Sequence, residues 1–298
     1  MSNLASLSKL IEDQLEDQYN FEEKLKNTDL LFHFTKAETA IKFILFEKKL
    51  KFNALKNMGD PWENKNFDHY YKNMDRKKSP EIFKKEEEIH KIKSYSKIAC
   101  FCTNKQPTIV TIEFDPQPNF TKSKLKYVKD NYCRPAYERS RMWNQYAENH
   151  KGICVVFSKE VLLKSIMRQL TGQTFYNDYV KYSPQYSYFQ KGLELDCNKL
   201  ISSNSETFVK EYLQNKKDYI FFSKNIDYRD EAEFRLVVYD PKDTFNYLDI
   251  QNCIKGVLLG ENCHDSIKKW IRDLCKELNI YCGIMEWRNG EPQPWPII

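Results

Sequence analysis

The sequence predicts an α+β protein in which a compact mixed sheet is surrounded by helices. Short apolar or alternating segments, typical of strands, are interspersed with segments whose apolar residues recur at helical spacing. No stretch rich in glycine, serine or proline divides the chain, and 298 residues are enough to bury a large core. We therefore expect a single α+β domain over residues 30–298, preceded by a helical extension over residues 1–29.

The first elements follow from the spacing of the apolar residues. Residues 6–26 have the pattern of an amphipathic helix. Residues 31–35 predict a strand, and residues 37–45 predict a helix because their apolar side chains fall at i, i+3, i+4, i+7 and i+8. The alternating segment KLKFN predicts a second strand. Residues 72–97 are highly charged, which predicts a solvated helix or a lid.

The later elements continue this mixture of strands and helices. Strands are predicted for KIACFCTN, TIVTIEFD, ICVVF, DYVKYS, EAEFRLVVYD, IKGVLLGE and IYCGIMEW. Helices are predicted for RSRMWNQYAENHKG, KEVLLKSIMRQL, SETFVKEYLQNKKDYIFFSK and DSIKKWIRDLCKELN. Gly152 would end the first of these helices as a left-handed cap, and Ser158 and Asp265 would be the N-caps of the second and the last. The final segment GEPQPWPII reads as a proline-rich tail.

The composition argues against several classes of protein. The net charge of +5 is modest, so charge alone does not indicate a nucleic-acid partner. The first residues lack the basic and apolar regions of a signal peptide, and no apolar run is long enough to cross a membrane. Nine irregularly spaced cysteines without a CxxC pair favour reduced thiols over a disulfide framework or a zinc site. We expect a cytoplasmic protein with no structural metal.

The segment FHFT places two polar side chains on one face of a predicted strand. Because side chains alternate along a strand, His33 and Thr35 share one face. Phe32 and Phe34 share the other. His33 is either a histidine that bonds a backbone carbonyl in the core or a residue at the rim of a ligand site. Thr35 is followed three residues later by Glu38, and this spacing favours a capping box for the next helix.

The segment NMGDPWE interrupts regular structure and carries two acids. Asp60 can fix the turn through a bond to its own backbone. Trp62 and Glu63 follow directly. A tryptophan beside two carboxylates can line a pocket, and it can equally anchor a loop to the core, so both interpretations stay open.

The segment EAEFR is the most informative chemical pattern in the chain. On a strand, Glu231, Glu233 and Arg235 point to the same side. Neighbouring carboxylates repel, so one pKa rises unless a cation such as Arg235 compensates. An arginine there could also bind a phosphate through two parallel hydrogen bonds. The following LVVYD is strongly apolar and favours a central strand, where charges usually mark a cleft; an exposed ladder of ion pairs is the alternative.

The predicted helix RSRMWNQYAENHKG carries aromatic and basic residues. Tyr146 lies on one side of the helix and Trp143 beside it, and aromatic residues at this spacing are more often core than stacking platforms. Arg139 and Arg141 stand at the start of the helix, where a positive charge is unfavourable to the helix dipole. A nearby phosphate or carboxylate explains them better.

Several enzyme classes lack their motifs here. The sequence has no GxSxG, P-loop, GxGxxG or HExxH segment. A Cys–His protease could use Cys100 or Cys154, but nothing marks either as a nucleophile. A metal-dependent nuclease could use Asp60, Glu231 and Glu233, and this alternative stays open.

Five segments in order resemble the bacterial domain-of-unknown-function family 2971. They are FHFT, KLKFNALKNMGDPWE, MWNQYAENHKGICVVF, YRDEAEFRLVV and IKGVLLG, and the resemblance covers residues 30–287. Members of the family carry His-Tyr-Thr-Ser, Asn-Asp-Pro-Phe-Glu, Met-Trp-x-x-Tyr-Ala and Trp-x-x-Glu-x-Glu-x-Arg. In this chain Phe34, Gly59, Trp62 and Tyr228 replace the Tyr, Asn, Phe and final Trp.

The front end of this family is in turn similar to ADP-ribosyltransferase-like proteins, including DarT-type toxins, which implies their split sheet and NAD as substrate. The likeness implies that His33 binds the NAD ribose and that Tyr146 or Trp143 stacks on nicotinamide. Glu231 or Glu233 would then hold the nicotinamide ribose. The sequence does not distinguish between these two acids. The remaining candidates for binding NAD are Thr35, Asp60, Trp62 and Arg235.

Three functions follow as hypotheses. The first is an ADP-ribosyltransferase-like enzyme that modifies a protein or nucleic acid, or hydrolyses NAD, as a toxin or anti-phage defence effector. This rests on analogy with a fold. The second is a nucleic-acid-acting defence protein, either a metal-dependent nuclease or a binding module, without NAD chemistry. The third is an interaction module in which EAEFR is only a buried ion-pair network. The first predicts that His33, Glu233 and an aromatic residue meet in one pocket.

Overall fold

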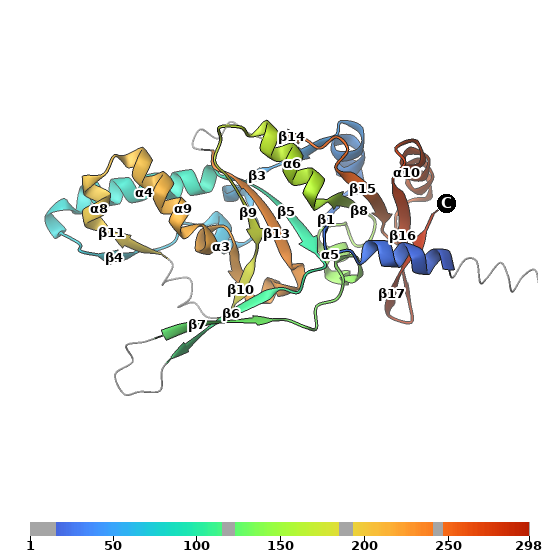
Figure 1. Ribbon diagram of the computed structural model, residues 1–298, viewed down its shortest axis with the longest axis horizontal. Coiled ribbons are helices and arrows are strands. Elements are labelled where there is room, and N and C mark those ends of the chain that lie inside the picture. The colour runs from blue at the N-terminus through green and yellow to red at the C-terminus, as the bar shows by residue number, and fades with distance from the viewer. Residues whose placement is uncertain (1–15, 115–122, 185–192, 241–246, 298) are drawn as a thin grey trace, which may run out of the picture.

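A nine-stranded mixed sheet forms the centre of the molecule in a computed structural model that describes residues 16–114, 123–184, 193–240 and 247–297 (Figure 1). Its order is β17-β16-β15-β8-β1-β5-β13-β9, with β3 paired to β5. The strands are β1 (Leu30–Thr35), β3 (Asn53–Ala54), β5 (Lys97–Thr103), β8 (Ile153–Ser158), β9 (Phe175–Tyr179), β13 (Glu233–Val238), β15 (Ile254–Leu259), β16 (Tyr281–Arg288) and β17 (Glu291–Pro296). The prediction of an α+β protein is confirmed.

Three smaller sheets surround the main one. A four-stranded sheet has the order β12-β10-β6-β7, and β11 pairs with β4 and β14 with β2. These strands are β2 (Lys49–Lys51), β4 (Tyr70–Lys72), β6 (Thr108–Phe114), β7 (Ser123–Lys129), β10 (Lys181–Ser183), β11 (Glu194–Asp196), β12 (Ser223–Asn225) and β14 (Tyr247–Asp249). Strand β12 of this second sheet is followed along the chain by η5 and β13. Its Lys224 therefore lies close to Glu233 at the start of β13.

Helices cover both faces of the main sheet. A helix over residues 16–25 begins the described chain. The others are α2 (Ala37–Thr39), α3 (Pro61–Asn64), α4 (Ser79–Tyr95), α5 (Ser140–Gln145), α6 (Lys159–Gln169), α8 (Cys197–Ser202), α9 (Ser205–Ile220) and α10 (Asp265–Glu277). A π-helical segment, η1 (Ala40–Phe46), continues α2, and 3-10 turns are η2 (Leu55–Asn57), η3 (Arg76–Lys78), η4 (Ala136–Glu138) and η5 (Ile226–Glu231). No helix among the described residues is long and apolar enough to cross a membrane.

The core consists of three large apolar clusters that follow this layering. One face of the sheet packs against α6, α10 and η1, through residues such as Leu162 and Ile271. The opposite face packs against α5 and the helix over residues 16–25, and Trp143 is fully buried there. A separate lobe of α4, α8 and α9 lies at the left of Figure 1 and has its own apolar cluster. All nine cysteines lie in the described residues and are free thiols.

Strand β1 pairs along its whole length with its neighbour on one side, but only in part with its neighbour on the other. It pairs with β8 at each of its six residues, from Leu30 to Thr35. It pairs with β5 only at Leu31 and Phe32. Beyond Phe32 the sheet therefore opens between β1 and β5, while β5 stays paired with β13 on its other edge.

Several predicted elements have different ends in the structure. The helix predicted for residues 37–45 is α2 followed by a π-helical segment, and its N-cap is Lys36 without a side-chain bond. The capping box of Thr35 was wrong because Thr35 still belongs to β1, where it pairs with Ile153. Ser158 does cap α6, accepting a bond from the amide of Val161. The N-cap of α10 is His264, whereas the predicted cap, Asp265, is the first residue of the helix.

The prediction that Gly152 ends helix α5 as a left-handed cap was wrong. Helix α5 ends at Gln145, and the left-handed residues lie in the turn that follows, at Glu148, Asn149 and His150. Glycine at position 152 is explained by lack of space and not by its torsion angles, since a Cβ there would collide with the carbonyl oxygen of Thr35. 

Three further segments also differ from the sequence prediction, and a fourth is described only in part. The predicted tail over residues 290–298 contains β17, an edge strand that tolerates its three prolines because an edge need not donate every amide. The segment DYVKYS divides between β9 and β10. Strand β13 begins at Glu233, because Ala232 has a φ of 38° and cannot extend the strand. Residues 6–15 of the first predicted helix lie outside the described residues.

Candidate active site

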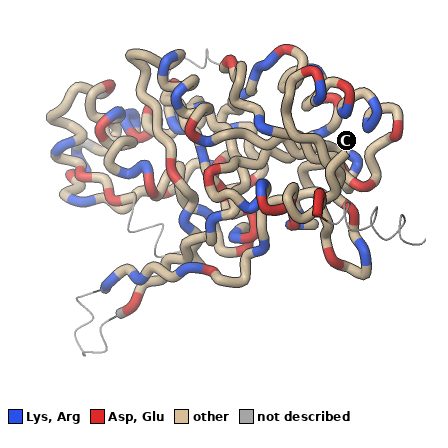
Figure 2. The backbone as a smooth tube through the Cα atoms, turned by 45° about the vertical axis from the view of Figure 1, so that its right-hand side comes forward, with Lys and Arg blue, Asp and Glu red and all other residues tan. Residues whose placement is uncertain are grey.

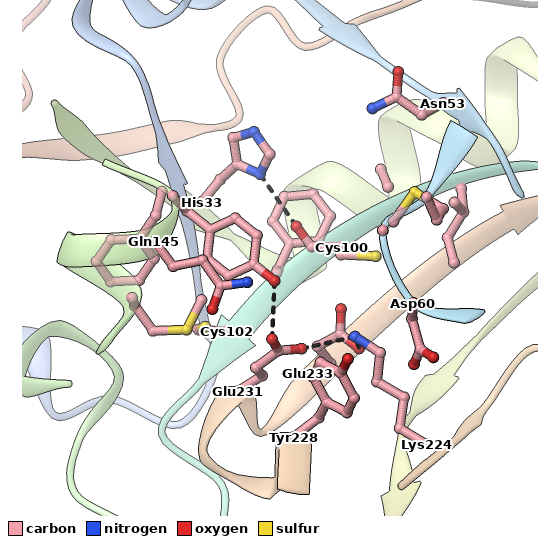
Figure 3. Close-up of a pocket in the computed structure, with 18 of the residues that line it drawn as sticks. His33, Asn53, Asp60, Cys100, Cys102, Gln145, Lys224, Tyr228, Glu231 and Glu233 are labelled. Atoms are coloured by element: carbon pink, nitrogen blue, oxygen red, sulfur yellow. Dashed lines mark hydrogen bonds and ion pairs between the residues drawn. The ribbon is translucent and has the colours of Figure 1, made fainter. Parts of the chain in front are cut away.

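A cavity of about 340 Å³ lies at the opening between β1 and β5 (Figure 3). Apolar side chains from both strands and from α5 line one part of it, among them Phe32, Phe34 and Met142. Four carboxylates line the other part, those of Asp60, Glu63, Glu231 and Glu233. The volume is near the lower end of the roughly 300–1,000 Å³ that is usual for ligand pockets, so it suits a small ligand or one end of a larger one.

Arg235 is fully buried behind the acids that line the cavity. Its Nη2 and Nε donate to Oε2 of Glu233, at 2.6 and 3.0 Å, and Nη2 also donates to Oε1 of Glu63. Its Nη1 donates to the carbonyl oxygen of Phe221 at 2.7 Å. With its donors taken by these partners, Arg235 positions two carboxylates and does not line the cavity.

Lys224, from β12, lies between three of the carboxylates. Its Nζ is 2.8 Å from Glu231, and 3.4 and 3.7 Å from the carboxylate oxygens of Glu233 and Glu63. Burial alone would lower the pKa of Lys224, but the surrounding carboxylates raise it well above its ordinary value. Arg141, 3.3 Å from Glu231, is a third cation beside Lys224 and Arg235, so three cations face these three acids. Asp60 is a fourth carboxylate in the lining, and this excess favours a ligand with positive charge.

The two glutamates of EAEFR have opposite pKa shifts. Burial would raise the pKa of Glu233, but the charges of Arg235 and Lys224 outweigh it and lower the pKa to about 2. Burial and the charge of Glu233 raise the pKa of Glu231 despite the opposing charge of Lys224. A pair of acids whose environments separate their pKa values can divide the roles of permanent anion and proton acceptor.

Glu231 is the acid that contacts α5 and the residue after it, and it is itself buried. It ends η5, and the left-handed Ala232 turns it away from the line of β13. Its Oε1 accepts bonds from Tyr146 Oη at 2.9 Å and from Arg141 Nη2 at 3.3 Å. Arg141 thus has the carboxylate that the sequence analysis expected near both arginines, whereas Arg139 donates to backbone carbonyl oxygens, those of Arg134, Thr103 and Glu231. Tyr146, 38 % exposed, connects this acid to the surface.

His33 lies across the opening from the acids. Its Nδ1 is 3.1 Å from the carbonyl oxygen of Cys100 on β5 (Figure 3). Since a carbonyl only accepts, Nδ1 carries the proton and Nε2 keeps a lone pair. Burial lowers the pKa of His33 and favours this neutral form. His33 therefore bonds a backbone carbonyl and also lines the cavity, so both interpretations from the sequence analysis apply to it.

The cavity brings together five of the residues that the sequence singled out. They are His33 on β1, Asp60 directly before α3, Tyr146 directly after α5, Glu231 at the end of η5 and Glu233 at the start of β13. Asp60 also caps α3 through a bond from the amide of Trp62, and its other oxygen is buried without a partner among the described residues.

The other candidates do not line the cavity. Trp143 is a core residue that packs edge-on against Phe34 at 5.1 Å and donates to a backbone carbonyl. Trp62 stacks on Phe67 at 6.0 Å and donates to the carbonyl oxygen of Tyr219. Thr35 stays at the end of β1. Both tryptophans thus have the core role that was the alternative in the sequence analysis.

Lys224 was missed by the sequence analysis, and the contacts of Glu63 with Arg235 were not foreseen. The sequence analysis had noted Glu63 as one of the two acids of NMGDPWE that can line a pocket, and it does line the cavity. Lys224 gives no signal of its own, since a single lysine after IFFS resembles any surface lysine. It becomes special only through the long-range pairing of β10 with β12.

The charges also bear on a nuclease mechanism. Lys224 Nζ occupies the space between Glu231 and Glu233 where a metal ion would be bound. Among the described residues, the donors that gather at metal-binding distance are instead His69, Glu86 and His90, outside this cavity. Basic and acidic residues are interspersed along the chain in Figure 2.

The family model described as "Protein of unknown function (DUF2971)" matches residues 142–236. This match supports the resemblance of the chain to that family over α5 to β13. The matched segment contributes Tyr146, Lys224, Glu231 and Glu233 to the cavity. No curated protein and no solved structure gives a significant match to the chain.

Proposed function

We propose that this protein is an ADP-ribosyltransferase-like enzyme that cleaves the bond between nicotinamide and ribose in NAD. One observation carries the proposal: His33 from β1 and two acids at the start of β13 line one cavity where the sheet opens beside β5. The resemblance noted in the sequence implies a histidine near the N-terminus, a late-strand glutamate and a split sheet around one site. The opening between β1 and β5 supports the last of these.

The charge of the site suits this substrate. The nicotinamide ring of NAD is a cation, and the cavity has an excess of carboxylates beside apolar and aromatic walls. When the bond between the ring nitrogen and ribose C1′ breaks, its electron pair neutralises the ring, and positive charge moves to the ribose. A fixed anion beside that oxocarbenium-like ribose stabilises the transition state. Glu233 suits this role because Arg235 and Lys224 keep it ionised.

Glu231 suits the second role, that of general base. An oxygen or nitrogen nucleophile, from an acceptor or from water, forms a new bond to C1′ and gives up its proton. Glu231 takes this proton, and its raised pKa makes it a better base than an ordinary carboxylate. Its position beside the partly exposed Tyr146 lets an acceptor approach from solvent. In this scheme Nε2 of His33 accepts a hydrogen bond from a ribose hydroxyl.

The alternatives have less support. A module without chemistry predicts no deep pocket behind His33, whereas a cavity lies there. A metal-dependent nuclease predicts a cation on Asp60, Glu231 and Glu233, where the ammonium of Lys224 already contacts two of the three acids.

The test uses purified protein and NAD labelled on nicotinamide and on the adenylate. Nicotinamide release and the destination of the adenylate label are followed with protein, nucleic acid or lysate as acceptor. Glu233→Gln is expected to slow release by about 10²–10⁴-fold, because it removes the charge but little volume. Glu231→Gln is expected to suppress transfer more than NAD binding, and His33→Ala to weaken binding. Glu211→Gln, on the exposed face of α9, is the matched control.

The outcomes separate the hypotheses. Label on an acceptor supports a transferase, and free ADP-ribose supports a hydrolase. No release with any acceptor, together with no NAD binding by calorimetry, would refute the NAD mechanism. Equal release by the wild type and Glu233→Gln would refute the role of that carboxylate.

A further inference from the structure

A second cluster of titratable residues lies in the lobe of α4, α8 and α9, away from the cavity. His69 stands directly before β4, and Glu86 and His90 are one turn apart on the same side of α4. His69 Nδ1 is 2.6 Å from Oε1 of Glu86, and His90 Nε2 is 3.8 Å from the same oxygen. One ligand atom from each residue lies within 4.8 Å of the others.

The cluster is buried and its polar atoms are not fully paired. His69 is 6 % exposed and His90 is 8 % exposed, and each has one ring nitrogen without a hydrogen-bond partner in the described structure. The ring of Phe67 packs edge-on against both imidazoles, at 5.1 and 5.0 Å. Buried polar atoms without partners are unusual in folded proteins, and a water or an ion commonly satisfies them.

Glu86 lacks a strong cationic partner. Within the described part of the chain, its ion-pair contacts are with the two histidines only. Its second oxygen accepts a bond from Tyr71 Oη at 2.7 Å, which fixes the carboxylate. Glu86 thus lies between two imidazoles and a tyrosine hydroxyl, and the cluster offers nitrogen and oxygen donors to a cation.

We propose that His69, Glu86 and His90 bind one divalent transition-metal ion, with zinc as the best match. Two imidazoles and one carboxylate are a recurrent zinc donor set, and the fourth position is then taken by water. Tyr71 holds the carboxylate from outside the coordination sphere, as such ligands usually require. None of these residues was singled out in the sequence, because the expectation of no metal was based on the spacing of the cysteines.

The distances between the donor atoms must change by about an ångström for all three residues to bind one ion. Two ligand atoms of a tetrahedral zinc ion are roughly 3.4 Å apart, given metal–ligand bonds of about 2.1 Å. The contact between His69 and Glu86 must therefore lengthen, while the widest separation in the cluster must shorten by about an ångström. A surface hollow lined by His90, Asn66 and Lys91 gives the ion a route from solvent.

The position of the cluster suggests what the metal would stabilise. Lys93, one turn beyond His90 on α4, donates to the carbonyl oxygens of Trp62 at 3.0 Å and Lys65 at 2.7 Å. These carbonyls flank the C-terminal end of α3, which carries Glu63 into the cavity. A metal that joins α4 to the segment before β4 would therefore hold in place the helix that supports α3.

The experiment uses the full-length protein after treatment with a chelator. Zinc titration by calorimetry is expected to give one site per chain, with a rise in melting temperature. Cobalt is expected to give the intense visible absorption of a four-coordinate site. His69→Gln, Glu86→Gln and His90→Gln should each weaken binding by more than about 100-fold, a larger loss than changes outside the coordination sphere cause. His264→Asn is the control, since it removes an exposed histidine and keeps an N-cap residue.

The wild-type measurements stand even if a variant fails to fold. Absence of stoichiometric zinc binding by the wild type, or a cobalt spectrum of octahedral type, would overturn the proposal. Binding that survives all three substitutions would also overturn it, and would assign the metal to other residues.

Discussion

Lys224→Met tests the charge network more directly than any other substitution. It removes an ammonium that lies 2.8, 3.4 and 3.7 Å from three carboxylate oxygens, while it keeps an unbranched chain of similar size. At an effective dielectric constant of about 20, each contact corresponds to roughly 5 kcal/mol of gross attraction, most of which desolvation offsets. Removal of one partner from a buried ion pair costs about 3–5 kcal/mol, because charges remain buried without compensation.

We therefore expect the free energy of unfolding to fall by about 3–5 kcal/mol at pH 7.5, a large share of the roughly 5–15 kcal/mol typical of proteins. The loss should shrink as the pH is lowered, because Glu231, whose pKa is already raised, becomes protonated and no longer needs the cation. Urea denaturation of the wild type and the variant at pH 7.5 and pH 5 measures both effects.

Two further variants make the reasoning refutable. Lys210→Met changes an exposed lysine on α9 and should alter stability by no more than about 0.5 kcal/mol. Lys224→Met combined with Glu231→Gln should recover part of the loss, since one buried charge is removed with its partner. If Lys224→Met is as stable as the wild type at pH 7.5, or loses more stability at pH 5, the network does not act as described.

The remaining predictions address single contacts. Tyr146→Phe removes a hydrogen bond that lowers the pKa of Glu231, so that pKa should rise and the acidic limb of the pH–activity profile of NAD cleavage should move to higher pH; an unmoved limb would exclude Glu231 as the base. Gly152→Ala brings a Cβ against the carbonyl oxygen of Thr35 and should destabilise the protein by about 1–3 kcal/mol in thermal or urea unfolding; unchanged stability would show that the turn relaxes freely. Trp143→Phe should lower stability by about 1–3 kcal/mol and leave NAD affinity unchanged, because Trp143 is a core residue; a selective loss of affinity would restore its stacking role.

The strands at the centre of the fold could be predicted from the sequence because their signal is local. The segment ICVVF is continuously apolar, and β8, which it forms, is buried on both faces. The apolar end of EAEFRLVVYD correctly indicated a central strand, β13, between β5 and β9. Fully buried strands need such runs, so composition over a few residues is enough to identify them.

The ends of elements were less predictable, because competing contacts decide them. Thr35 and Glu38 have the spacing of a capping box, yet pairing with β8 keeps Thr35 in the strand. GEPQPWPII contains three prolines, yet it forms an edge strand beside β16. In both cases a strand from a distant part of the chain supplies the deciding hydrogen bonds, and the local pattern does not contain that information.

The residues of the candidate site also differ in how far the sequence predicts them. The acids of EAEFR and His33 could be found from alternation, since charged residues on a predicted strand need an explanation. Their partner Lys224 could not, because its place depends on the parallel pairing of β10 with β12. The sequence analysis also treated Glu231 and Glu233 as equivalent positions on one strand face, whereas the left-handed Ala232 separates them.

That torsion has a consequence for how the site can vary. Ala232 is buried and has a φ of 38°, a conformation that β-branched residues strongly avoid. The direction in which Glu231 points is therefore set by the backbone at a residue that does not line the cavity. A glycine at this position would keep the geometry, while a valine would draw the chain toward an extended strand and carry one acid away from the other. The separation of the two acids is thus controlled by the backbone torsion of the residue between them.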